Sequence, residues 1–382
     1  MPAGTPREVA EILGAQRTAF RDATVDYLLR RLPRLRRVAP LRQRRRAEAL
    51  TERAVGLVAR SPQGMLRGED AADLERAGRA NRRLGVPLRV YPVLAQALKA
   101  GLRAAFEAAG EPYTAAARDA EALAEAACAS LARGAYGADL AGVPAATAGE
   151  VVAVEHPTRT ITALTVDTGA PVPRLAGQHL PATTPLAGGE WAPLSPAGAP
   201  DESGQLTFFL HRAKHPVYRR LSDARVGDQV LLGEPEGGLS VPAGPAPATI
   251  VALDEGYAAA RALVFELLGS EEPPETHLII ETRYPGEHVE LARLEALAAA
   301  ASWLSVTAVS REEADPWWLA ARQTGGHVRR GAAAVASLVD SPAAADRTVR
   351  LVGPAALAEP AARDLRAAGV RDLEVEAWGD PA

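Results

Sequence analysis

The sequence has only one cysteine, Cys128, in 382 residues. One thiol can form neither an internal disulfide nor a multi-cysteine metal site, so both are excluded. Aromatic residues are scarce, and lysine occurs only twice against a large excess of arginine. We attribute this arginine bias to the codon composition of a GC-rich genome rather than to selection for guanidinium chemistry.

Long apolar stretches are missing as well. Residues 1–13 show no basic segment followed by an apolar one, so no signal peptide is expected. No run of about 18 uncharged apolar residues is present, so no membrane-spanning helix is expected either. We therefore predict a cytoplasmic protein that does not contact a membrane.

What is present is the composition of a folded chain of two or three domains. Hydrophobic residues make up 47% of the sequence and charged residues 24%, which argues against disorder. The net charge of −4 hides an uneven distribution, because residues 1–60 carry 14 arginines and 6 acidic residues. Such a basic segment can attract an acidic partner. The competing interpretation is a helix face that is solvated or that docks on the acidic part of the same chain. We do not expect nucleic acid to bind. The arginines of this candidate basic face are Arg30, Arg34, Arg37, Arg42, Arg45 and Arg46.

Residues 6 to about 137 have helical patterning throughout. Leucine and phenylalanine recur at i, i+4 spacing between residues 94 and 106, which predicts one face of a helix. Thr114 is a candidate N-cap of the next, alanine-rich helix, which we expect to end near Gly134. The pattern predicts an all-α domain over residues 1–143.

Short β-branched runs separated by Gly, Pro and Asp follow, and they predict an antiparallel barrel or sandwich over residues 144–245. These runs lie at residues 151–156, 160–167, 177–183, 206–213 and 228–235. From about residue 247 strands and helices alternate, which predicts a doubly wound parallel sheet over residues 246–382. Its expected helices cover residues 258–268, 291–301, 332–340 and 357–369.

Five stretches in this order resemble the flavohaemoglobin family. They are residues 79–98 (RANRRLGVPLRVYPVLAQAL), 191–213, 225–241, 350–370 and 376–380. The resemblance spans about residues 10–380. It implies a globin-like domain, an FAD-binding reductase barrel and an NAD-binding α/β domain. In that family hydride passes from a nicotinamide to flavin, and electrons then pass to haem iron, where nitric oxide and dioxygen become nitrate.

The haem position implied by the resemblance is altered. Asn81 stands where the family has its proximal histidine, and an amide oxygen is a poor iron ligand. Residues 1–155 contain no histidine at all. Tyr91 resembles a tyrosine that supports the proximal histidine, and Leu29 stands at the distal tyrosine position. We therefore expect no haem ligand and no haem.

The flavin position is altered too. The family pattern Arg-x-Tyr-Ser is present here as residues 192–195, of which only Ser195 is retained. Ala192 replaces the arginine that fixes a flavin phosphate in the family, and losing this charge-assisted contact costs about 1.5–3 kcal/mol. A Gly-Gly-x-x-Ser turn is replaced by residues 214–218. Lys214 and Arg219 offer new cationic contacts, and Trp378 keeps an aromatic residue in the tail that covers the flavin in relatives. FAD therefore stays open as the one cofactor that could be retained.

The nicotinamide position keeps one glycine, Gly256, of the family's Gly-Gly-Thr-Gly turn. Asp254 and Glu255 place negative charge where a dinucleotide phosphate would bind at the helix start. Val352 replaces the cysteine that lies beside the hydride-transfer position, and we expect it to be a buried strand residue. We therefore expect no nicotinamide and no metal, and we assign no catalytic residue.

These losses favour a pseudoenzyme over an enzyme. We predict a flavohaemoglobin-like scaffold that acts in regulation or protein interaction and binds a protein partner or a small apolar ligand. The alternative is a flavin-dependent NAD(P)H oxidoreductase without haem, which holds FAD through Ser195, Lys214, Arg219 and Trp378.

Overall fold

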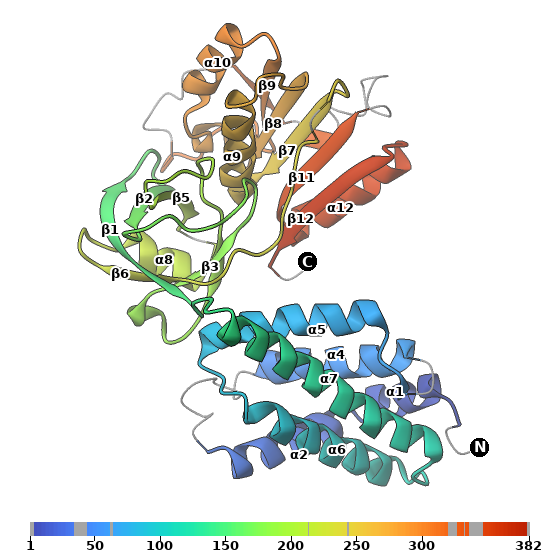
Figure 1. Cartoon of the computed structure of the whole chain (residues 1–382). Coiled ribbons are helices and arrows are strands. Elements are labelled where there is room, and N and C mark those ends of the chain that lie inside the picture. The colour runs from blue at the N-terminus through green and yellow to red at the C-terminus, as the bar shows by residue number, and fades with distance from the viewer. Residues whose placement is uncertain are drawn as a thin grey trace. The chain divides into compact units, whose positions relative to one another are not determined.

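The computed structural model describes residues 4–33, 44–61, 64–212, 214–242, 244–319, 327–331, 333–335 and 347–379. The chain divides into two compact units, Met1–Ala146 and Thr147–Ala382. The first unit is helical (Figure 1). Its elements are α1 (Pro6–Ala15), α2 (Arg17–Arg31), α4 (Arg44–Arg60), α5 (Gly68–Ala80), the 3-10 helix η2 (Asn81–Leu84), α6 (Val90–Ala109) and α7 (Ala115–Leu140).

Capping side chains begin two of these helices. Thr5 and Glu8 form a capping box at α1, and the Thr114 hydroxyl accepts a hydrogen bond from the backbone N–H of Ala117 at α7, as predicted. The core contains the fully buried rings of Phe20 and Phe106, packed among leucines and alanines. Small alanines leave room for close helix packing, which compensates for the scarcity of aromatic residues.

The predicted end of α7 near Gly134 is wrong, because this helix continues to Leu140. A Cβ atom at Gly134 would lie 1.8 Å from the carbonyl oxygen of Glu75 on α5. The glycine therefore allows the two helices to approach rather than ending one of them.

The second unit begins with a six-stranded antiparallel sheet in the order β4-β3-β6-β1-β2-β5. A bridge between Pro196 and Phe208 joins the β4 edge to β5, so the sheet nearly closes into a barrel. Alternate residues of β2 and β5 point into its core, which α8 also covers. The elements are β1 (Thr147–Glu155), β2 (Ile161–Asp167), β3 (Leu180–Thr183), η3 (Pro185–Ala187), β4 (Ala192–Leu194), β5 (Gln205–His211), α8 (Pro216–Ser222) and β6 (Gln229–Leu232).

The rest of this unit is a parallel sheet in the order β10-β9-β8-β7-β11-β12. Its central strand β7 is buried along its whole length, as expected of a strand with helices on both faces. Helices α9 and α10 cover one face and α12 the other (Figure 1). The elements are β7 (Ala248–Leu253), η4 (Asp254–Gly256), α9 (Tyr257–Leu268), β8 (Thr276–Thr282), η5 (Pro285–Glu287), α10 (Leu291–Ala300), β9 (Leu304–Ser310), β10 (Val328–Arg330), β11 (Thr348–Pro354), α12 (Ala355–Ala367) and β12 (Asp372–Trp378).

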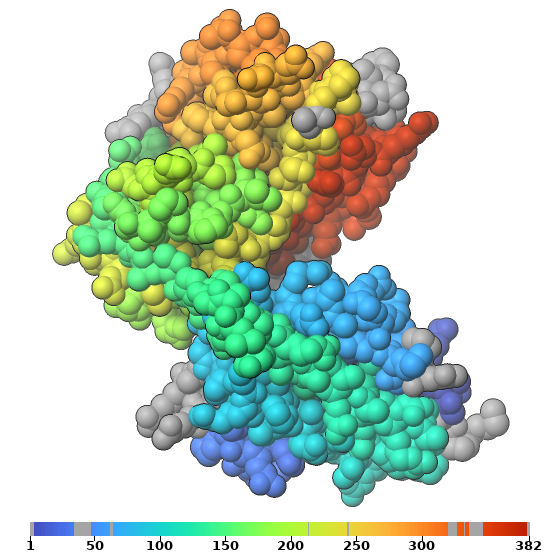
Figure 2. Space-filling view, in the orientation of Figure 1, coloured from blue at the N-terminus to red at the C-terminus, as the bar shows by residue number. Residues whose placement is uncertain are grey.

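The three predicted architectures are thus confirmed: a helical domain, an antiparallel barrel and a doubly wound parallel sheet. Most of the helix predicted at residues 332–340 lies outside the described residues. The barrel and the parallel sheet contact each other directly, since the guanidinium of Arg261 on α9 donates to the carbonyl oxygen of Ala197 (2.6 Å). Figure 2 shows their surfaces as continuous, from the green barrel to the yellow and orange α/β part. Among the described helices, none combines the length and the apolar character needed to cross a membrane.

Candidate functional site

A cavity of about 790 Å³ lies between the barrel and the parallel sheet. We call this cavity the cleft. The sheet contributes residues that directly follow the carboxyl ends of β7 and β8, the edge at which open α/β sheets bind ligands. The barrel contributes the β1–β2 turn, the end of β5 and part of α8. Five of the lining side chains are cationic: Arg159, Arg212, Lys214, Arg219 and Arg283.

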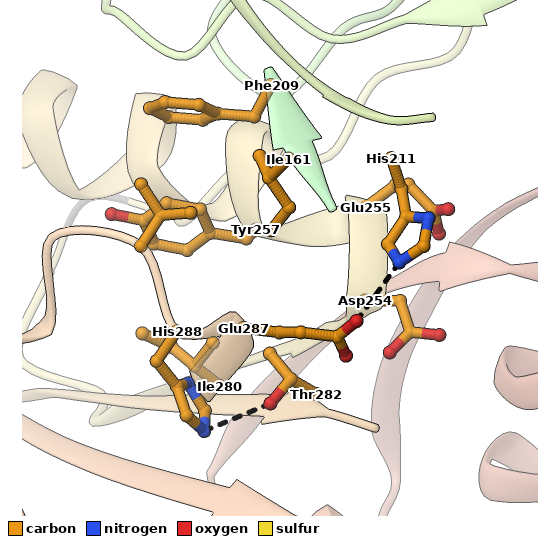
Figure 3. A pocket seen from close by; sticks show the side chains of 11 residues that line it. Ile161, Phe209, His211, Asp254, Glu255, Tyr257, Ile280, Thr282, Glu287 and His288 are labelled. Carbon is orange, nitrogen blue, oxygen red and sulfur yellow. Dashed lines mark hydrogen bonds and ion pairs between the residues drawn. The ribbon is translucent and has the colours of Figure 1, made fainter. Parts of the chain in front are cut away.

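On one wall of the cleft, the partly buried His211 lies between carboxyl groups (Figure 3). Nε2 of His211 lies 3.1 Å from Oε1 of Glu287, a side chain that is almost fully buried. Glu255 lies on the other side of His211, and neither of its oxygens has a hydrogen-bond partner in the described part of the chain. Burial, and then the neighbouring Asp254, raise the pKa of Glu255. The group can therefore hold a proton, but the described residues include no cluster suited to a metal ion.

Side chains of this protein occupy the turn where a dinucleotide phosphate would bind. Asp254, which has a left-handed backbone (φ 47°), pairs with Arg311 (2.8 Å) and Lys214 (3.1 Å). Gly256 serves packing, because a Cβ atom there would lie 2.1 Å from the carbonyl oxygen of Val352. Val352 itself is a fully buried strand residue, as predicted. These contacts do not fit a bound dinucleotide phosphate.

The flavin position is partly filled in the same way. The hydroxyl of Tyr218 donates to the carbonyl oxygen of Pro193 on β4 (2.6 Å), and the Tyr218 side chain is buried. Nδ1 of His215 accepts a hydrogen bond from the backbone N–H of Val217, so α8 is capped from within the chain. Ser195 is the exception, since its Oγ is buried and has no hydrogen-bond partner among the described residues. The position therefore retains one polar group that fits a flavin and has lost the charge and the stacking surface.

Trp378 ends β12 and packs on the barrel. Its ring lies 6.0 Å from that of His179, measured between centroids. Nδ1 of His179 lies 3.2 Å from Glu376 on β12, and Nε2 lies 3.7 Å from Glu236 of the barrel. Burial lowers the pKa of His179, but hydrogen bonds and charge attraction from the two glutamates outweigh it and raise that pKa to about 9. Trp378 thus belongs to a group of contacts that joins β12 to the barrel.

In the helical unit, the predicted proximal position contains no iron ligand. Asn81 begins η2, directly after α5, and is hydrogen-bonded to Tyr91. Tyr91 is almost fully buried, and its hydroxyl donates to the carbonyl oxygen of Gly78 (3.4 Å). Burial raises the pKa of the Cys128 thiol to about 12, which disfavours a thiolate.

A cavity of about 520 Å³ opens between α4 and α5, and five of its eight lining residues are charged. Arg60 from α4 and Asp70 from α5 form an ion pair across it (2.8 Å), and Arg53 and Asp73 also line it. Haem needs a largely apolar slot with an axial ligand. The residues present do not fit haem.

The predicted basic face is described only in part. Arg30 is exposed at the end of α2. Arg34, Arg37 and Arg42 lie outside the described residues, and the side chains of Arg45 and Arg46 on α4 do as well.

Solved structures of known proteins share this fold. A flavohaemoglobin from Malassezia yamatoensis, with bound FAD and haem, is 16% identical over 99% of this chain and 100% of its own, with a TM-score of 0.71. A ferredoxin NADP+ reductase from Neisseria gonorrhoeae with bound FAD and NADP (16% identity, TM-score 0.51) covers 61% of this chain and 99% of its own. The flavohaemoglobin-like FAD/NAD-binding domain of a Vibrio cholerae nitric oxide dioxygenase covers the same shares (17%, TM-score 0.50). The sequence matches no protein-family model and no curated protein.

The chain therefore has the fold and the domain order of a flavohaemoglobin, which confirms the resemblance predicted from its sequence. Of the predicted cofactor contacts, the structure brings Lys214 and Arg219 together in the cleft, whereas Ser195 and Trp378 lie outside its lining. Sequence reasoning missed Arg159, Arg212 and Arg283. They come from separate segments and share no motif, so only the folded chain places them side by side.

Proposed function

We propose that this chain is a non-catalytic member of the flavohaemoglobin fold, which binds a ligand or a protein partner and lacks haem and nicotinamide chemistry. One observation carries the proposal: side chains of the chain itself lie at the cofactor positions and bond to other parts of the chain there. Asp254 is paired with Arg311 and Lys214, and Tyr218 is bonded to Pro193. A cofactor that displaced them would have to offset these buried contacts as well as the missing ligands.

The helical unit supports the same proposal. Asn81 is hydrogen-bonded to Tyr91, whose hydroxyl also donates to the carbonyl oxygen of Gly78 on α5, so neither side chain is presented to an iron atom. Arg30, which is exposed at the end of α2, offers one contact for an acidic protein partner.

An absorbance spectrum tests the proposal directly. The protein is purified from a host supplied with haem and riboflavin, beside the Malassezia yamatoensis flavohaemoglobin from the same host as the positive control. We expect no Soret band and no flavin band, while the control shows both. A stoichiometric Soret band from the purified chain would contradict the proposal.

A second candidate function rests on Ser195. Its buried, unpartnered hydroxyl supports an oxidoreductase that holds FAD without the family's arginine and tyrosine. The test is oxidation of NADH or NADPH by protein loaded with excess FAD, compared with its Ser195→Ala variant. Turnover that the substitution reduces would favour this second function over the first.

A further inference from the structure

Trp317 is the most exposed large apolar side chain in the described part of the chain, with 90% of its surface accessible to solvent. It lies in a turn that follows β9 and includes Trp318 and Leu319. A bare indole ring exposes a large apolar area to water, and burying it against a partner releases that water. A single exposed apolar side chain is ordinary, so the surroundings of Trp317 decide whether it belongs to a contact surface.

The turn that carries Trp317 is fixed at both ends. The carboxylate of Asp315 accepts a hydrogen bond from the backbone N–H of Gly286 (2.7 Å). Leu319 is buried, and its backbone N–H donates to the carbonyl oxygen of Pro316 (2.8 Å). Trp317 is therefore held in solvent by the structure around it. A side chain presented in this way loses little conformational freedom when a partner binds.

Aromatic rings and guanidinium groups surround the neighbouring Trp318. Its ring meets that of Tyr284 edge to face, with centroids 6.0 Å apart. The Arg283 guanidinium lies 5.0 Å from the Tyr284 ring centroid, and Arg159 from the β1–β2 turn donates to the carbonyl oxygen of Trp318 (2.9 Å). We call these five residues, Trp317 included, the aromatic–arginine surface. Trp, Tyr and Arg are the residue types most enriched among those that dominate protein–protein binding energies.

Both arginines of this surface are available to an anionic group. Arg159 forms no ion pair with any residue that the structure describes, and its bond to Trp318 is made to a neutral carbonyl oxygen. Arg283 lies 3.7 Å from Glu312, and both side chains are more than half exposed. An exposed pair of this kind contributes at most about 1 kcal/mol, so a carboxylate of a partner can replace it.

The surrounding charges favour a peptide segment over an extended polyanion. Nucleic acids and anionic membranes present negative charge over a wide area. Glu312 and Glu313 are exposed on the segment that leads into the Trp317 turn, and they would repel such an area. A peptide segment is narrow enough to place carboxylates on Arg159 and Arg283 without covering these glutamates.

We propose that the aromatic–arginine surface binds a protein partner through a short acidic segment that also carries an apolar side chain. The apolar side chain packs on Trp317, and the carboxylates pair with Arg159 and Arg283. This inference rests on the proposed function, because it names the class of partner that a non-catalytic member of the fold would bind.

Selection of random phage-displayed peptides on the full-length protein supplies a probe. We expect the enriched peptides to be acidic and to carry an apolar side chain. Fluorescence anisotropy with the most enriched peptide then measures its affinity at low and at high salt. Replacing the acidic residues of this peptide with the corresponding amides should weaken binding by about tenfold or more, because the arginines lose their partners.

Trp317→Ala should weaken binding of the same peptide by about tenfold or more, without lowering the thermal stability of the protein. Leu186→Ala is its control, since Leu186 is also exposed (72%) but lies on η3 of the barrel. Arg159→Ala should weaken binding as well, and Arg220→Ala, at an exposed position of α8, is the matched control. Both controls should stay within about twofold of the wild-type affinity.

Enriched peptides that lack acidic residues would overturn the inference, as would equal losses in the Trp317→Ala and Leu186→Ala variants. Trp317-dependent pelleting with phosphatidylserine vesicles in place of peptide binding would overturn it in favour of a membrane surface. A Trp317-dependent dimer in sedimentation velocity would overturn it in favour of a second copy of the chain. Peptide binding by protein that carries stoichiometric haem would refute the proposed function and leave this surface standing, whereas cofactor-free protein that enriches no peptide would refute this inference alone.

Discussion

His179 makes the stability of the second unit dependent on pH. The glutamates on either side raise its pKa to about 9 in the folded chain, against an ordinary value of 6.5. The folded state therefore binds the proton more tightly than the unfolded state does, so the stabilisation is complete below pH 6.5. It is lost as the pH rises to about 9. The contribution is at most about 3.5 kcal/mol, at about 1.4 kcal/mol per pKa unit.

We expect His179→Gln to lower the free energy of urea unfolding at pH 6 and to have a much smaller effect near pH 9. The exposed His327 provides the control, because His327→Gln should leave the wild-type pH profile unchanged. A difference between wild type and His179→Gln that stays constant with pH would show that the imidazole acts by packing alone.

At the residue scale, only part of the site could be predicted from the sequence. Lys214 and Arg219 were expected to be cationic contacts, and both line the cleft. The pairing of Lys214 with Asp254 could not be foreseen, since the two residues come from different domains and a sequence pattern carries no distance. Similarly, Gly256 was expected to be part of a nucleotide turn, whereas its contact with Val352 explains it by packing.

At the scale of elements, α5 and α7 depend on two glycines at their crossing. A Cβ atom at Gly78 would lie 1.9 Å from the carbonyl oxygen of Leu131, and one at Gly134 would lie 1.8 Å from that of Glu75. Each glycine thus faces the backbone of the other helix. We expect Gly78→Ala and Gly134→Ala each to destabilise the helical unit by about 1–3 kcal/mol, because the helices must move apart. Thermal unfolding followed by circular dichroism at 222 nm measures this.

Gly137 supplies the control on the same helix. A Cβ atom there would have no neighbour within 4 Å. Gly137→Ala should therefore raise stability by up to about 1 kcal/mol, the ordinary gain of alanine over glycine in a helix. If Gly134→Ala were also stabilising, the close approach of α5 and α7 would not need the glycine.

Gly134 also explains one error of the sequence-based prediction. A glycine near the end of an alanine-rich run is typical of a helix C-terminus, and the sequence alone does not distinguish this from a packing contact. Thr114 was assigned correctly because its capping bond is made within its own first turn. Local chemistry was therefore predictable at this scale, and contacts between elements were not.

At the scale of the whole molecule, periodicity was sufficient for the architecture. The change from helical spacing to short β-branched runs, and then to alternating strands and helices, matches the helical unit, the barrel and the parallel sheet. The order of strands within each sheet was not predictable, because it depends on pairings between segments far apart in the chain.

Each of the two units has hydrophobic cores of its own. One cluster packs around Phe106 in Met1–Ala146, and others pack around Phe208 and Ile250 in Thr147–Ala382. A unit with its own core can unfold cooperatively by itself. We expect differential scanning calorimetry of the full chain to show two transitions, and fragments 1–146 and 147–382 each to reproduce one of them. A single transition for the full chain, together with a fragment 147–382 that lacks cooperative unfolding, would show that the second unit requires the helical unit in order to fold.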